Sequence, residues 1–177
     1  YDPIYTGGKF KFLPNKIAIP DKYSLEDMVR EGFSRKILVV TGNPHTDSIC
    51  DLREQFTISD KLKVRKDLGL DEKSFVLMFA SQPIEQRRGN YYGYTQKTIL
   101  RELLDSLRSF EGKKDFNVLV KTHPAEVVNN LEPVTKGYGF RIVLDRDYDT
   151  FKAVLATDAV ISPFSTTLIE ACYIGKP

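Results

Sequence analysis

The chain has 177 residues, of which 41% are hydrophobic and 11% aromatic, so it is long and apolar enough for one domain with a core and is not a disordered chain. Its 26 basic and 24 acidic side chains are interspersed and leave a net charge of only +2, which argues against nucleic acid as the partner. No apolar run approaches the roughly 20 residues that cross a bilayer, and the sequence that begins at Tyr1 opens with neither a basic n-region nor an apolar h-region. We expect no membrane span in this chain and a cytoplasmic location, with a peripheral position at the inner membrane face as an alternative for the full-length protein.

The first 35 residues differ from the rest of the chain. They contain a polar and aromatic stretch around Gly7 and Gly8, a short apolar run at 17–20, and a helical pattern at 24–32 with Ser24 as its N-cap. We expect residues 1–35 to be a connector or the tail of a preceding domain. Residues 36–177 are expected to form one domain that is truncated at its C-terminus, because Gly-Lys-Pro normally leads into another strand.

Five short apolar runs recur along the second region, each followed by a turn signal and a segment with helical spacing. The runs are 36–41, 75–81, 116–122, 141–144 and 159–162. Several are apolar throughout instead of alternating, as in strands that are covered on both faces. The sequence therefore predicts an α/β fold, a doubly wound Rossmann-like parallel sheet with helices on both faces.

The helices between these runs are predicted from their apolar spacing. The clearest is 95–110, in which Ile99, Leu103, Leu104 and Leu107 form one stripe. Shorter helices are expected at 46–54, 61–68, 125–131, 148–156 and 166–174. The polar and aromatic segment 82–94 is expected to be a long functional loop.

Ligands of open α/β sheets bind beyond the carboxyl ends of the strands, so the residues that follow each run are the candidate site. Glycines, hydroxyls, a lysine and a histidine at one sheet edge favour an anion with a polar head group. These candidates are Gly42, Asn43, Ser81, Gln82, Lys121, His123, Pro124, Ser165, Thr166 and Thr167.

Each candidate also has a structural alternative. Ser165, Thr166 and Thr167 open a helix whose N-terminus favours phosphate, but Thr167 and Glu170 also have capping-box spacing. His123 is either a donor to a phosphate or ribose, or a helix cap before Pro124. Arg87 and Arg88 are either a diphosphate clamp or a solvated pair.

Several activities lack their signatures in this sequence. It contains no Ser-His-Asp order, HExxH motif, Walker loop or GxGxxG motif. Cys50 and Cys172 are far apart with no CxxC pattern, so we expect two buried small apolar residues and no metal site.

Four motifs in this order resemble the C-terminal, donor-binding half of GT-B glycosyltransferases. They are Gly42-Asn43-Pro44 with Asp47, Ser81-Gln82-Pro83, Lys121-Thr122-His123-Pro124, and Ser165-Thr166-Thr167 followed by Glu170 and Gly175-Lys176-Pro177. The nearest likenesses are CDP-glycerol glycerophosphotransferases and bacterial sialyl- and polysialyltransferases, with UDP-N-acetylglucosamine 2-epimerase more distant. The resemblance covers residues 17–177.

The resemblance implies roles for particular residues. In the sialyl and glycerophosphate families, motifs matching His123-Pro124 and Ser165-Thr166 contact the cytidine nucleotide and its phosphate. Across GT-B enzymes, an acidic residue of the helix, at the place of Glu170, often holds the ribose hydroxyls. The catalytic base of such enzymes usually comes from the N-terminal domain, so it is unknown here and this chain alone is expected to be inactive. No cofactor is expected besides the activated donor, which is a nucleotide sugar or CDP-alcohol.

The expected function is therefore the nucleotide-binding half of a transferase. The whole enzyme would move a sugar or glycerol-phosphate-like group from a CMP-, CDP- or UDP-activated donor to a surface-glycan acceptor, with the acceptor bound through the other domain. The alternatives are an epimerase of the 2-epimerase type and a non-catalytic α/β interaction domain.

Overall fold

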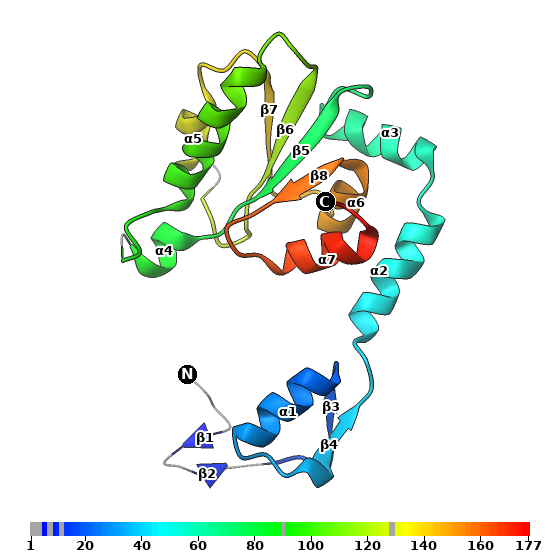
Figure 1. Cartoon of the computed structure of the whole chain (residues 1–177). Helices are drawn as coiled ribbons and strands as arrows, with labels where there is room; N and C mark the ends of the chain where they lie inside the picture. Colours follow the sequence, from blue (N-terminus) through cyan, green and yellow to red (C-terminus); the bar gives the residue numbers. More distant parts are fainter. Residues whose placement is uncertain (1–4, 7–8, 11–12, 90, 128–129) are drawn as a thin grey trace. The chain divides into compact units, whose positions relative to one another are not determined.

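A computed structural model describes residues 5–6, 9–10, 13–89, 91–127 and 130–177 (Figure 1). Two compact units divide the chain, Tyr1–Asp47 and Ser48–Pro177, and each is described by itself. The predicted features at Gly7 and Gly8 lie outside the described residues, as do Asn90 in the 82–94 segment and part of the predicted helix at 125–131.

In its described residues, the first unit contains two small sheets and the helix α1 (Lys22–Arg30), and α2 (Pro44–Gln55) begins at its end. An antiparallel pair, β1 (Tyr5–Thr6) and β2 (Lys9–Phe10), precedes a parallel pair in which β3 (Ile17–Ile19) lies beside β4 (Leu38–Val40). The helix α1 (Lys22–Arg30) and a 3-10 turn (Arg35–Ile37) connect β3 to β4. Ile19, Leu25 and Leu38 form the small core of this unit.

Two expectations for this region are corrected. The run at 36–41 does form a strand, but it pairs with β3 instead of joining the large sheet. An apolar run predicts a strand but does not specify the strand with which it pairs, and the nearby strand Ile17–Ile19 is the partner here. The cap of α1 is Asp21, whose carboxylate accepts a hydrogen bond from the Ser24 backbone, so Ser24 lies inside the helix.

The second unit is built on a four-stranded parallel sheet in the order β7-β6-β5-β8. Its strands are β5 (Phe75–Ala80), β6 (Phe116–Lys121), β7 (Arg141–Asp145) and β8 (Ala159–Ile161). Its α-helices are α2 (Pro44–Gln55, which begins in the first unit), α3 (Ile58–Asp67), α4 (Ile84–Arg88), α5 (Gln96–Leu107), α6 (Thr150–Ala156) and α7 (Thr166–Ile174), with 3-10 turns at Arg108–Phe110 and Glu132–Thr135.

Successive strand residues face opposite sides of the sheet, and both sides are covered by helices. Met78 and Leu119 pack with residues of α2, α3, α6 and α7 on one side. Phe79 and Val118 pack on the other side with α5 and the turn at Glu132–Thr135. This arrangement confirms the predicted α/β fold and explains why most residues of the strands are apolar on both faces of the sheet.

Most predicted helices are present, with shifted ends. The first residue of the predicted 95–110 helix, Thr95, is the N-cap of α5, and the predicted 166–174 helix has the bounds of α7. The segment 82–94 is not wholly a loop, because it contains α4. The helix expected from residue 125 is absent over the described residues 125–127, where the chain forms a turn.

None of the helices in the described parts of the chain has the length and apolar character that crossing a bilayer requires. Both cysteines are free thiols, and the expectation that they are buried is wrong, since Cys50 is partly exposed and Cys172 is exposed.

Candidate functional site

A cavity of about 200 Å³ opens in the second unit at the point where the strand order reverses. The chain proceeds from β5 to β6 and β7 on one side, and β8 then returns to the other side of β5. Such a reversal at the carboxyl ends of parallel strands is where open α/β sheets bind ligands. The cavity is lined by residues that follow β5 and β8, namely Gln82, Pro83, Ile84, Arg87, Arg88, Tyr92 and Phe164.

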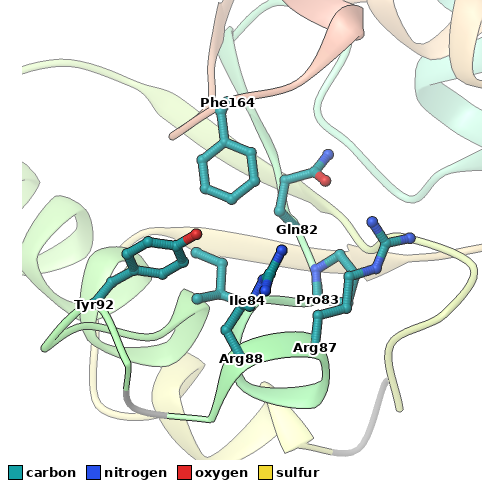
Figure 2. A pocket seen from close by; sticks show the side chains of 7 residues that line it. All are labelled: Gln82, Pro83, Ile84, Arg87, Arg88, Tyr92 and Phe164. Carbon is teal, nitrogen blue, oxygen red and sulfur yellow. The ribbon is translucent and has the colours of Figure 1, made fainter. Parts of the chain in front are cut away.

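The lining combines charge with aromatic surface. Figure 2 shows the Arg87 and Arg88 guanidinium groups, the Gln82 amide and the rings of Tyr92 and Phe164 around this cavity. Guanidinium forks suit phosphate oxygens, and aromatic faces suit a planar ring. The structure thus brings together Gln82 and the predicted phosphate clamp.

The short helix that carries both arginines is held by the start of α5. Gln96 is fully buried, its Oε1 accepts a hydrogen bond of 2.9 Å from the Glu85 backbone, and its Nε2 donates to Gln86 Oε1 at 2.8 Å. Lys97 adds an ion pair with Glu85 at 2.7 Å. These contacts fix α4 at the cavity.

His123 lies in a tight turn immediately after β6. Its ring Nδ1 accepts a hydrogen bond of 3.0 Å from the Ala125 backbone, and its own backbone N–H donates to Glu126 Oε2 at 2.7 Å. A neutral imidazole that accepts at Nδ1 carries its proton at Nε2. The ring therefore caps a turn, not a helix, and its remaining N–H donor is at Nε2.

The Lys121 ammonium contacts other parts of the chain instead of facing a ligand site. It is 5% exposed, and its ammonium donates to the Asp145 carboxylate at 2.5 Å, to the Arg146 carbonyl at 2.8 Å and to the Tyr148 carbonyl. Since an ammonium has three protons, these contacts use all of its donors. Lys121 organises the loop after β7 and is not available to a nucleotide in this arrangement.

Ser81 is also buried, and its hydroxyl donates to Glu126 Oε1 at 2.8 Å. Its backbone N–H continues the β5–β6 pairing through the Lys121 carbonyl at 2.9 Å. Ser81 thus lies between the cavity, which starts at Gln82, and the His123 turn.

One residue of the hydroxyl cluster caps α7, but it is not Thr167, the residue with capping-box spacing. Ser165 is the N-cap, and its hydroxyl accepts from the Thr167 backbone at 3.2 Å. Thr167 consequently lies in the first turn, so its capping box with Glu170 does not form. Thr166 is exposed as the first residue of the helix and Glu170 is partly exposed on it, and their ligand roles remain predictions.

Gly42 and Asn43 belong to the first unit. Gly42 has φ +81°, which favours glycine, and Asn43 Oδ1 accepts from the His45 backbone at 3.1 Å at the start of α2. Their predicted contact with a nucleotide remains a prediction.

Sequence reasoning did not select Tyr92, Phe164 and Glu126 as site residues. Phe164 directly precedes Ser165 and is 51% exposed. The signal available in the sequence was an aromatic residue beside the polar residues that follow a strand. Among the described residues, no group of His, Cys, Asp and Glu side chains could hold a metal ion.

Comparison with known proteins gives the relatives of this fold. The wall teichoic acid polymerase TagF matches with a TM-score of 0.61 and 18% identity over 92% of this chain and 38% of that chain. A variant of TagF soaked with CDPG matches with a TM-score of 0.62 and 19% identity, over 92% of this chain and 36% of that chain. This chain therefore spans well under half the length of these polymerase structures.

No curated protein matches the chain significantly. The sequence profile of the family described as CDP-Glycerol:Poly(glycerophosphate) glycerophosphotransferase matches residues 20–177, which is most of the chain. The chain thus belongs to the CDP-glycerol:poly(glycerophosphate) glycerophosphotransferase family.

Proposed function

We propose that this chain is the donor-binding part of a transferase that uses CDP-glycerol and has the two-domain GT-B arrangement. The whole protein moves glycerol phosphate to a hydroxyl of a surface-glycan acceptor. The observation that carries this proposal is the cavity at the β5/β8 reversal, with Arg87 and Arg88 on its wall, in a chain of this family. Relatives soaked with CDPG are consistent with the same donor.

The chemistry assigned to the whole protein is a phosphoryl substitution. The acceptor oxygen bonds to the phosphorus that carries glycerol, the bond from this phosphorus to the CMP oxygen breaks, and the acceptor proton passes to a general base. We place that base in the other domain of the whole protein. This half holds the CMP leaving group and stabilises its negative charge.

The residues divide this task by chemistry. Arg87 and Arg88 supply two planar cations for phosphate oxygens, and the Nε2–H of His123 supplies a neutral donor. Tyr92 and Phe164 offer ring faces to the cytosine. Ser165 and Thr166 place hydroxyls at the positive end of α7.

Titration calorimetry on the full-length protein tests this proposal. CDP-glycerol and CMP should bind, and the double variant Arg87→Ala/Arg88→Ala should weaken CDP-glycerol binding about tenfold or more, since a hydrogen bond to a charged group is worth about 1.5–3 kcal/mol. Arg101→Ala is the matched control, because Arg101 is an exposed arginine on α5 outside the cavity. The Arg101→Ala variant should bind CDP-glycerol with the same affinity as the wild type.

Two results would contradict the proposal. Binding of UDP-N-acetylglucosamine without binding of CDP-glycerol would favour the epimerase alternative. A folded full-length protein that binds no nucleotide would favour the interaction domain.

A further inference from the structure

The carboxylate of Glu126 occupies an unusual position for an acidic side chain. Glu126 is 3% exposed, whereas Glu is almost never fully buried unless its oxygens are paired. Both oxygens have partners: Oε1 accepts from the Ser81 hydroxyl at 2.8 Å and Oε2 accepts from the His123 backbone at 2.7 Å. The carboxylate is therefore built into the fold by two hydrogen bonds.

These two partners come from neighbouring strand exits. Ser81 is the first residue after β5, and His123 is the second residue after β6. The last backbone contact described between the two strands is Ser81 N–H to the Lys121 carbonyl. Glu126 extends this pairing by a side-chain bridge from the residue next to the cavity to the His123 turn.

The same turn also holds the His123 ring. With its backbone N–H on Glu126, the His123 turn closes so that the Ala125 backbone N–H meets ring Nδ1 at 3.0 Å. On the opposite side Arg146 donates to the Pro124 carbonyl at 2.8 Å. A turn held from both sides selects one imidazole orientation and one neutral tautomer, with the proton at Nε2.

We propose that Glu126 is a positioning residue, whose buried carboxylate couples Ser81 to the His123 turn and thereby holds the His123 Nε2–H donor toward the nucleotide donor. The ligand part of this inference rests on the proposed function. Ser81, predicted as a nucleotide ligand, acts in this arrangement as the anchor of the carboxylate.

The test uses the full-length protein and four variants, Glu126→Ala, Glu126→Gln, His123→Ala and the double variant His123→Ala/Glu126→Ala. Glu126→Ala should weaken CDP-glycerol binding by about the same factor as His123→Ala, on the order of tenfold. The double variant should be no weaker than His123→Ala alone, because the two residues act as one unit.

The conservative variant Glu126→Gln should bind CDP-glycerol with an affinity within about twofold of the wild-type value. A glutamine amide oxygen can accept from the His123 backbone while its NH₂ group donates to Ser81, since a hydroxyl can reverse from donor to acceptor. Glu132→Ala removes an exposed glutamate from the same segment and is the matched control. It should leave the affinity unchanged.

Imidazole ¹⁵N NMR provides a readout that needs no ligand. His123 should show the Nε2–H tautomer in the wild type and in Glu126→Gln, and a mixture of tautomers in Glu126→Ala. If the Glu126→Ala protein does not fold, Ser81→Ala removes one anchor of the same carboxylate and should shift the tautomer and the affinity in the same direction.

The inference is overturned if the losses from His123→Ala and Glu126→Ala multiply, or if the His123 tautomer in Glu126→Ala is that of the wild type. A wild-type protein that binds no CDP-glycerol, but whose His123 tautomer responds to Glu126, would refute the proposed function and leave the positioning role intact.

Discussion

Lys121 and His123 are two residues apart at the end of β6, and the fold gives them opposite tasks. Lys121 lies inside the molecule with its ammonium saturated by the loop that follows β7. His123 is half-buried and retains a ring donor. A sequence motif places both at a strand exit, but the direction of each side chain depends on neighbours that lie far along the chain.

Replacing Lys121 by methionine should therefore reduce stability. The change keeps most of the side-chain stem and leaves the Asp145 carboxylate, 17% exposed in the pair, without its cation. Loss of one partner of a buried ion pair costs about 3 kcal/mol or more. Urea denaturation of wild type and variant measures the difference.

The matched control is Lys63→Met, which breaks an i,i+4 ion pair with Asp67 at the surface. Its loss should be much smaller, because water screens exposed pairs. Equal losses from the two variants would show that Lys121 is not a structural cation.

At the scale of elements, the sequence predicted the strands and helices that depend on local patterns of apolar residues. The strands β5 to β8 and helices such as α5 and α7 follow from apolar runs and helical stripes, whereas the predicted caps Ser24 and Thr167 lie inside their helices. The pairing of β4 with β3 did not follow, because a short apolar run does not specify its neighbour. The turn at Pro124 was also missed. Glutamate is a common helix residue, so Glu126 after Pro124 suggested a helix, whereas its buried carboxylate in fact closes the turn.

Of the candidate site residues, Gln82, Arg87 and Arg88 line one cavity, and the ligand roles of all the candidates remain predictions. Parallel strands end at one edge of a sheet, so the sequence predicted Gln82 and the hydroxyls around Ser165 at the same edge. The assignment of Ser81 and Lys121 to architecture required side-chain contacts between strands. The ring of Phe164 was also not identified, because no spacing rule links it to Arg88 across the cavity.

Substitution of two helix caps, one proposed to contact the ligand and one not, distinguishes an effect on stability from an effect on binding. Ser165 caps α7 and Thr95 caps α5, and each accepts a hydrogen bond from a backbone N–H of the first turn. Ser165→Ala and Thr95→Ala should each reduce the free energy of unfolding by about 1 kcal/mol. Only Ser165→Ala should also weaken CDP-glycerol binding, which calorimetry on the full-length protein would measure. Unchanged affinity in Ser165→Ala would limit Ser165 to capping.

For the second unit as a whole, one partly buried charge network joins segments that are remote in sequence. Arg65 of α3 is 3% exposed and donates to the carbonyls of Ala156, Glu72 and Ser74. It also pairs with Asp158 at 2.6 Å, and the same carboxylate accepts from the Val76 backbone. A single side chain thus fastens α3 to β5 and to the turn that enters β8.

This network predicts an acid-sensitive stability. Burial raises the pKa of Asp158, but hydrogen bonds from Lys61, the Val76 backbone and Arg65 outweigh burial and hold the pKa below its ordinary value of 3.8. Because the folded-state pKa is depressed, this contribution is fully present above the unfolded-state value and is lost as the pH falls through the folded-state pKa.

Denaturation of wild type and Asp158→Asn from pH 6 to pH 3 measures the effect. The wild type should lose more free energy of unfolding over the acidic end of this range than the variant, which has no carboxylate to protonate at this position. Parallel pH profiles would assign the acid sensitivity to other groups.

The reversal of strand order also has a consequence for the order of assembly. The pairs β5–β6 and β6–β7 join segments that are closer along the chain than the pair β5–β8, which meets at Leu77 to Phe79. Closing the longer loop costs more chain entropy, so β8 is expected to dock last. Phe164 reaches the cavity only with that docking. A bound nucleotide would therefore select chains that have completed their final strand pairing, and ligand binding would report the last step of folding.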